Sequence, residues 1–327
     1  MRWLVCLLVL VLAAAGGGRA SADELRPGYV ELRQRDAVTW TLGWKQPLVR
    51  AGEPQLVMPK VPDNCRIVDG PHRRVAALAL VGNAELACNG PIAGGTAGFE
   101  DIVGGGDVLL RVAPITGGVQ SYRLTPSASI VELEAEAAPG QVWRTYGLIG
   151  VEHILMGWDH LLFVIALVLL VRRGWAVAGA VTAFTVAHSL TLAGVTLGLV
   201  GLPPRPVEAV IALSIVFLAV ELVRGRDRPS LTLRFPWAIA FAFGLFHGFG
   251  FAGALAEIGL PDGEVPAALL AFNLGVEAGQ LFVVAVVIAV LALASRIAAR
   301  MVEPAVRVAA YAIGITASYW LIDRIVV

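Results

Sequence analysis

The stretch YGLIGVEHILMGWDHLLFVIALVLLV, residues 146–171, decides the fold class of this chain. It contains no lysine or arginine, and a helix rising about 1.5 Å per residue over this length would cross a hydrocarbon core about 30 Å thick. Comparable apolar runs follow at residues 175–200, 207–223, 236–257, 266–294 and 304–325. The sequence therefore predicts an α-helical integral membrane bundle of about six transmembrane helices within residues 141–327.

The composition agrees with a membrane protein. Hydrophobic residues make up 57% of the chain and charged residues 15%, whereas soluble domains average about 45–50% and about 25%. The formal net charge is +0, so nothing in the charge balance points to a nucleic-acid partner.

Basic residues in the loops predict the orientation of the helices, because cytoplasmic loops of membrane proteins are enriched in lysine and arginine. Nine arginines lie in alternate loops, after the first, third and fifth apolar runs, whereas the other two loops carry Arg205 alone, and Asp262 with Glu264. The nine are Arg172, Arg173, Arg224, Arg226, Arg228, Arg234, Arg296, Arg300 and Arg307. We therefore expect the bacterial inner membrane as the location, with both the segment before residue 141 and the C-terminus in the periplasm.

The N-terminal 140 residues are typical of an exported segment. Residues 1–22 combine Arg2, a short apolar run and a small-residue cleavage site, as in a signal peptide; an uncleaved anchor helix is the alternative. Residues 23–140 predict a periplasmic all-β domain, antiparallel and β-sandwich-like. Cys65 and Cys88 indicate one disulfide in an oxidising compartment, with two unpaired thiols as the alternative. The expected strands cover residues 29–33, 38–44, 75–81, 85–88, 108–112 and 119–124.

Ionisable side chains inside the predicted helices are candidates for function, because charged groups are costly in lipid. His153 and His160 are two helical turns apart on one face. His160 would lie about 18 Å deep by helical rise, with His153 near the periplasmic surface. The two histidines would thus form two successive rungs, that is, two separate ion-binding positions between the periplasm and the middle of the membrane. Histidines and a glutamate on other predicted helices fall near the depth of His160, and Gly244 and Gly248 allow a neighbouring helix to approach His247 closely.

These groups predict a metal site at mid-membrane depth. Imidazoles and carboxylates suit divalent first-row metals such as Ni²⁺, Co²⁺ or Zn²⁺, and the lack of cysteine in the predicted helices argues against a thiolate site for Cu⁺. Asp159 can bind the metal or orient a histidine from behind. The predicted ligands are His153, Asp159, His160, His188, His247 and Glu277, supported by Glu152, Ser189, Asn273 and Gln280.

The first predicted helix resembles the signature of the HupE/UreJ family, His-x3-Gly-x-Asp-His, at His153, Gly157, Asp159 and His160. The resemblance implies nickel or cobalt permeation, or a part in hydrogenase and urease maturation, and points to the two histidines and the aspartate as metal or permeation residues. Shorter family members have several histidines in the fourth helix, where this chain has one. Segments similar to the branch with a large exported domain lie at residues 24–32, 184–192, 243–252 and 272–280, and the cysteine pair also resembles that branch.

We therefore expect a permease for a divalent transition metal, nickel or cobalt, whose series of sites binds weakly enough to release the ion. We do not expect an enzyme. The sequence has no P-loop motif for nucleotide binding, so the energy for any active transport would come from the membrane potential, a proton gradient or a partner protein. The expected partners are the lipid bilayer, the metal ion and a periplasmic or membrane protein.

Two alternatives remain open. An intramembrane hydrolase could hold Zn²⁺ on three histidines with an open position for water, and Asp159 or Glu277 would be its general base. An accessory or sensor protein would instead use the exported domain to bind a partner, with the helices as an anchor.

Overall fold

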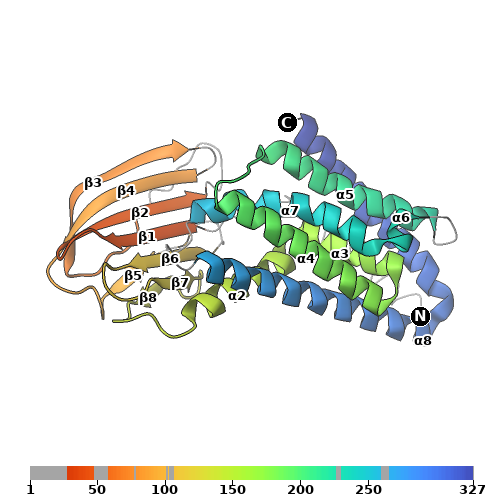
Figure 1. The fold of residues 1–327 in the computed structure, drawn as a ribbon, viewed down its shortest axis with the longest axis horizontal. Coiled ribbons are helices and arrows are strands. Elements are labelled where there is room, and N and C mark those ends of the chain that lie inside the picture. The colour runs from red at the N-terminus through yellow and green to blue at the C-terminus, as the bar shows by residue number, and fades with distance from the viewer. Residues whose placement is uncertain are drawn as a thin grey trace. The chain divides into compact units, whose positions relative to one another are not determined.

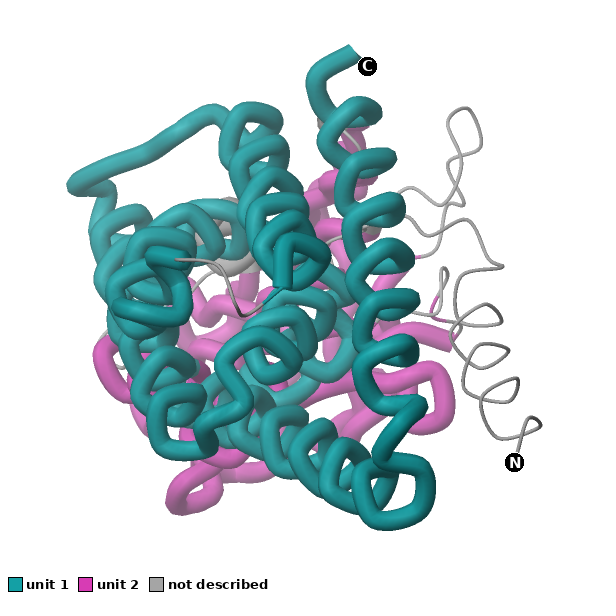
Figure 2. The backbone as a smooth tube through the Cα atoms, turned by 90° about the vertical axis from the view of Figure 1, so that its right-hand side faces the viewer, with its two compact units in different colours: residues 1–24, 150–253, 273–327 teal, residues 25–149, 254–272 magenta. Residues whose placement is uncertain are grey.

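The computed structural model describes residues 28–47, 58–76, 79–100, 102, 107–225, 230–258 and 265–326 (Figure 1). The predicted signal peptide, residues 1–22, lies outside the described residues. The chain divides into two compact units (Figure 2): one includes residues 150–253 and 273–327, and the other includes residues 25–149 and 254–272. The first unit is helical, and the second contains the strands of the described residues.

The β unit contains a six-stranded sheet, in the order β3-β4-β2-β1-β6-β7, and a two-stranded sheet of β5 and β8. The prediction of a β-rich N-terminal domain is confirmed. One pair departs from the antiparallel expectation, because β1 and β6 run parallel, with Val30 opposite Leu110. The strands are β1 (Gly28–Gln34), β2 (Thr39–Pro47), β3 (Cys65–Ala76), β4 (Ala79–Cys88), β5 (Thr96–Gly98), β6 (Val108–Ala113), β7 (Gln120–Leu124) and β8 (Ile130–Glu132).

Strand β3 differs most from the sequence-based expectation. The expected strand at residues 75–81 instead covers the end of β3 and the start of β4. Gly70 and Pro71, which disfavour a strand, lie in the middle of β3. Every residue from 66 to 75 is exposed, so this part of the strand has no alternation of buried and exposed side chains that a sequence pattern could reveal. Figure 1 shows β3 at the free edge of the sheet, which is where glycine and proline are tolerated.

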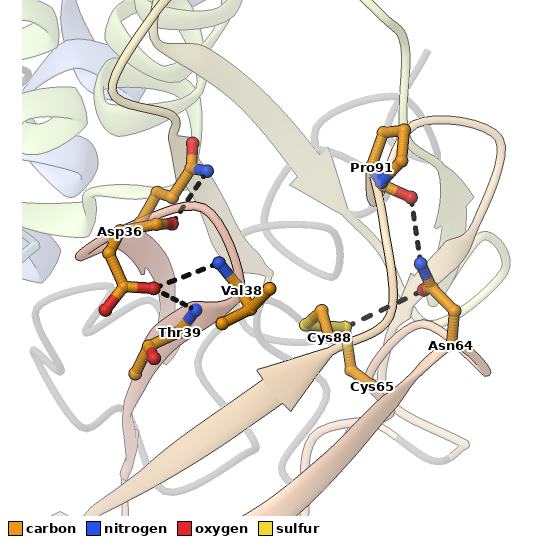
Figure 3. Close-up of a disulfide and its surroundings, with 8 residues drawn as sticks. Asp36, Val38, Thr39, Asn64, Cys65, Cys88 and Pro91 are labelled. Carbon is orange, nitrogen blue, oxygen red and sulfur yellow. Dashed lines mark hydrogen bonds between the residues drawn. A yellow bond between two sulfur atoms is a disulfide. The ribbon is translucent and has the colours of Figure 1, made fainter.

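The core of the β unit forms around buried tryptophans on β2. Trp44 lies opposite Gly82 of β4, where a Cβ atom would come within 2.1 Å of the Trp44 ring, so this position requires glycine. Cys65 at the start of β3 faces Cys88 at the end of β4, and the two form the predicted disulfide (Figure 3).

The helices largely follow the predicted apolar runs. Among the described residues, α4, α5 and α8 are long and apolar enough to cross a membrane, and the bent pair of α2 and α3 qualifies as a fourth span when counted together. The described apolar part of α7, Pro236–Phe251, is shorter. The helices are α2 (Gln141–Met156), α3 (Trp158–Val171), α4 (Gly174–Thr196), α5 (Pro204–Arg224), α6 (Leu231–Arg234), α7 (Pro236–Ile258) and α8 (Val265–Val326).

The first predicted helix is not continuous, which corrects the expectation of one straight span. Helix α2 ends at Met156, α3 begins at Trp158, and the two are bent by 70°. Gly157 between them has an extended backbone (φ −75°, ψ 99°), and its N–H donates to the carbonyl oxygen of His153 at 3.0 Å. A Cβ atom on Gly157 would lie 2.6 Å from that oxygen, so the tight turn depends on glycine.

Helix α8 contains both the fifth and the sixth predicted runs. Its helical path is interrupted at Ala298 (φ −149°, ψ 57°), and Pro304 follows shortly after. The two predicted runs therefore correspond to the two parts of α8 on either side of this interruption.

Helices α4 and α7 approach each other closely within the helical unit. A Cβ atom on Gly244 would lie 2.5 Å from the carbonyl oxygen of Phe184, and one on Gly248 would lie 2.0 Å from the Thr191 hydroxyl. The close approach predicted from the two glycines is confirmed.

Candidate metal centre

Four histidines from four helices form one buried cluster inside the helical unit. His153 lies in the last turn of α2, His160 in the first turn of α3, His188 in α4 and His247 in α7. The ring of His160 is central: its centroid is 4.5 Å from that of His153, 4.9 Å from that of His247 and 6.3 Å from that of His188.

The break at Gly157 is what brings His153 and His160 together. On a continuous helix, residues seven positions apart would be separated by about 10.5 Å along the axis. The bend between α2 and α3 instead leaves the two ring centroids 4.5 Å apart. The two histidines therefore belong to one cluster, in place of the two separate rungs expected from the sequence.

Three of the histidines have an oxygen acceptor at Nδ1. A carboxylate or carbonyl oxygen can only accept, so Nδ1 carries the proton and Nε2 keeps its lone pair. Metal-binding histidines are commonly oriented by such an acceptor. The pairs are His160 with Asp159 Oδ1 at 2.9 Å, His188 with Asn273 Oδ1 at 3.2 Å and His247 with the carbonyl oxygen of Phe243 at 3.0 Å.

The Nε2 atoms of His160 and His247 are buried and have no hydrogen-bond partner among the described residues. Leaving a buried polar atom without a partner costs about 1–3 kcal/mol, which a bound ligand would offset. His153, His160 and His188 each offer one nitrogen, and these atoms all lie within 4.8 Å of one another. This set of three donors therefore fits a divalent transition metal. The His247 ring lies beside that of His160, with centroids 4.9 Å apart, but His247 is outside this group of donor atoms.

Asp159 places a carboxylate directly beside this cluster. Its Oδ1 accepts from both the ring Nδ1 and the backbone N–H of His160, the latter at 2.8 Å. Because Asp159 lies in the first turn of α3, its negative charge also faces the positive end of the helix dipole. The residue thus fits the orienting role that was one of its two predicted roles.

Phenylalanine rings line the cluster, and sequence reasoning missed them. Phe163, Phe184 and Phe251 each contact at least one of the four imidazoles. Their spacing could have revealed them, because each lies three or four residues from a histidine of its own helix and so shares its face.

Glu277 contacts a different set of residues. Its carboxylate accepts hydrogen bonds from the hydroxyls of Thr182, at 2.6 Å, and Thr185, at 2.5 Å. The Thr185 hydroxyl also lies 3.0 Å from Oε1 of Gln280. Glu277 is outside the group of residues whose donor atoms come within 4.8 Å of one another. The structure therefore groups the predicted Glu277 and Gln280 with threonines of α4, and Thr182 is an addition to the predicted set.

The other supporting residues have separate places. Asn273 contacts His188 as described above, and so connects α8 to the histidine cluster. The Ser189 hydroxyl donates to the carbonyl oxygen of Thr185 at 2.6 Å, a bond within α4. Glu152 is half-buried on α2 next to His153.

Helices long and apolar enough to cross a membrane, together with a buried histidine cluster that could hold a metal ion, are the features by which this chain can be classed. The family model described as HupE / UreJ protein matches residues 130–324, so the chain belongs to the HupE/UreJ family. Membership supports a metal transport or accessory role rather than an enzymatic one. Searches of curated proteins and of solved structures found no significant match.

Proposed function

We propose that the chain is a permease for a divalent transition metal, nickel or cobalt, and that His153, His160, His188 and His247 bind the ion. One observation carries the proposal: oxygen acceptors orient three buried imidazoles at Nδ1. Two of these, His160 and His188, together with His153, each bring a ring nitrogen within 4.8 Å of the others. Family membership supports the same class of function.

Passage of the ion requires that it can leave as well as bind. Neutral imidazoles with a carboxylate at Asp159 attract a dication without surrounding it with negative charge. The carboxylate of Glu277, with the hydroxyls of Thr182 and Thr185, offers oxygen ligands for a second ion-binding position, or station, along the path. His188 and Thr185 lie on neighbouring turns of α4, and their partners Asn273 and Glu277 lie on neighbouring turns of α8, so both stations share one helix pair.

The membrane placement is part of the proposal. We place the helical unit in the bacterial inner membrane with six crossings, and the β unit in the periplasm. The alternating arginine-rich loops and the apolar helices support this arrangement.

A zinc hydrolase fits the geometry less well. Such an enzyme needs a general base positioned at a metal-bound water. Oδ1 of Asp159 is held by His160, and Glu277 is hydrogen-bonded by two threonines. The carboxylates named for that role thus already have other contacts.

Metal uptake by a bacterial host that lacks its own nickel and cobalt importers tests the proposal. Cells expressing the wild-type chain should accumulate Ni²⁺ or Co²⁺ above cells with an empty vector, and His160→Ala should remove the gain because the central imidazole is lost. His72→Ala is the matched control, since His72 is exposed in β3 and pairs there with the exposed Asp69.

Two results would overturn the permease. Cellular metal that does not rise with the wild-type chain would leave only an accessory role. Full uptake by His160→Ala, at equal amounts of protein in the membrane, would show that the ion does not use this cluster.

A further inference from the structure

We infer that two ion pairs act as gates at the two ends of the helical unit and open in turn. The inner gate is Arg172 with Glu303, and the outer gate is Glu208 with Arg324. The gates rest on the proposed function, the permease, and give it a way to expose the ion to one side at a time. The later part of α8, residues 299–326, supplies one residue to each gate.

The later part of α8 buries one stripe of its surface inside the helical unit. The buried residues share one face of the helix because they recur every three or four positions. They are Val306, Ala310, Ile313, Ala317 and Trp320. Glu303 precedes this stripe by three residues and Arg324 follows it by four, so the two charged residues lie at its two ends.

The inner gate joins the start of this part of α8 to the end of α3. The Arg172 guanidinium contacts Oε1 of Glu303, and its Nε donates to the carbonyl oxygen of Leu169 at 3.0 Å. Arg172 directly follows α3, whose first turn carries His160 of the histidine cluster. In the proposed orientation, this ion pair lies at the cytoplasmic end of the helical unit.

The outer gate joins the end of α8 to the first turns of α5. Nε of Arg324 lies 3.2 Å from Oε2 of Glu208, and its Nη1 donates to the backbone carbonyl oxygen of the same residue at 3.2 Å. Two contacts from one planar guanidinium hold the two helix ends in a defined position. In the proposed orientation, this ion pair lies at the periplasmic end.

A small-residue contact lies midway between the two gates. A Cβ atom on Gly314 of α8 would lie 3.3 Å from the Cβ of Ala219 on α5, so the two helices touch closely at this position, which we call the pivot. The helical path of α8 is interrupted at Ala298, where a hinge can absorb changes in backbone angle. Helices α3 and α5 pack against each other. A tilt of the later part of α8 about the pivot would therefore open one gate and press the other closed.

Ion pairs suit gates because water can replace the contacts of each partner when the two separate, whereas an apolar stripe loses its burial. Separation also frees a carboxylate, that of Glu208 outside or that of Glu303 inside. A freed carboxylate attracts a dication to the end that has opened.

Cross-linking of the purified full-length protein, followed by its insertion into liposomes, tests the gates. Two double variants place a pair of thiols at one gate each: Glu208→Cys with Arg324→Cys, and Arg172→Cys with Glu303→Cys. Each variant is compared with itself before a bifunctional thiol reagent is added. Joining either pair should lower Co²⁺ entry, followed with a metal-sensitive dye inside the liposomes, to about a tenth or less.

Ala219→Cys with Gly314→Cys is the matched control on the same two helices as the outer gate. The Cβ separation of 3.3 Å at the pivot is close to the roughly 3.5–4.5 Å found in disulfides, so these thiols can bond directly. Because the pivot keeps its contact in both states, this bond should leave most of the Co²⁺ entry. Cys65 and Cys88 already form a disulfide and do not react with the reagent.

A second measurement reports whether the two gates are linked. Arg324→Gln removes the charge that closes the outer gate, so the outer end should stay open, and the inner gate closed, for more of the time. The thiols of Arg172→Cys with Glu303→Cys should then cross-link about threefold faster than they do when Arg324 is present.

The outcomes separate the gates from the permease. Full Co²⁺ entry after either gate is joined, an equal loss after the pivot is joined, or an unchanged cross-linking rate in Arg324→Gln would overturn the alternating gates and leave the permease in place. If liposomes with the wild-type protein take up no Co²⁺, the permease is refuted, and the gates with it.

Discussion

At the scale of single residues, Asp159 determines how firmly the central imidazole is held. It accepts from the ring and from the backbone N–H of His160, at 2.9 Å and 2.8 Å. Asp159→Asn keeps the size of the side chain but removes the charge that polarises the imidazole and offsets the charge of the ion. We expect the affinity for Co²⁺, measured by calorimetric titration, to fall about 10- to 100-fold.

The β unit offers a matched control for this variant. Asp69 forms a similar pair with His72 at 3.3 Å, but both side chains are more than 60% exposed. Asp69→Asn should therefore leave Co²⁺ affinity unchanged. Equal affinity of Asp159→Asn and the wild-type protein would show that Asp159 does not orient a ligand.

The identities of the site residues could be read from the sequence better than their contacts. The four histidines stand out as ionisable groups in apolar runs, and the structure brings them into one cluster. The helical spacing of His153 and His160 predicts two rungs, because nothing in a spacing rule anticipates the break at Gly157. The carbonyl of Phe243 behind His247 is equally invisible, since every residue carries a backbone carbonyl.

At the scale of secondary-structure elements, the contact of α4 with α7 depends on a small residue. A Cβ atom on Gly248 would lie 2.0 Å from the Thr191 hydroxyl and 2.5 Å from the carbonyl oxygen of His188. Gly248→Ala must therefore push the helices apart and move His188 away from His247. We expect a loss of about 1–3 kcal/mol in stability from the overpacking, measured as a lower thermal midpoint in detergent, together with weaker Co²⁺ binding.

Gly179→Ala is the control for the element scale. Gly179 also lies inside α4, but a Cβ atom there meets nothing within 4 Å. Because alanine favours a helix over glycine by about 1 kcal/mol, this variant should be as stable as the wild-type protein or slightly more so. A thermal midpoint for Gly248→Ala as high as that for Gly179→Ala would contradict the close contact.

Elements with a strong pattern could be predicted, and those shaped by tertiary contacts could not. The apolar runs at residues 175–200 and 207–223 anticipate α4 and α5, since length and hydropathy suffice for a spanning helix. Strand β3 is held by its pairing with β4 rather than by its own pattern. The parallel pairing of β1 with β6 joins segments far apart in the chain, which no local pattern encodes.

At the scale of the whole molecule, the number of membrane crossings sets the side on which the chain ends. Helix α8 has 62 residues, which at about 1.5 Å each extend roughly three times the thickness of a hydrocarbon core. We therefore expect it to supply more than one crossing. The interruption at Ala298 lies among Arg296, Arg300 and Arg307, so we expect the turn between two crossings at the cytoplasmic surface.

Whether the bent pair of α2 and α3 crosses the membrane then determines the total number of crossings. As one broken span, the pair brings the crossings to six together with α4, α5, α7 and the two parts of α8, and the C-terminus lies in the periplasm with the β unit. As a re-entrant segment, it leaves the total odd and the C-terminus in the cytoplasm. Arg172 and Arg173 follow α3 directly, and basic residues mark a cytoplasmic end. We therefore expect the pair to cross.

Reporter fusions distinguish these two topologies. Alkaline phosphatase is active only in the periplasm and green fluorescent protein is fluorescent only in the cytoplasm. We expect active phosphatase when it is fused after Val327 or inserted at Gly201 between α4 and α5, because both positions are periplasmic if α2 and α3 cross. A fusion after Gly140 is the control, since it precedes the bent pair and is periplasmic either way. Fluorescence from the C-terminal fusion, with inactive phosphatase at Gly201, would make α2 and α3 a re-entrant segment that enters and leaves the membrane on the periplasmic side.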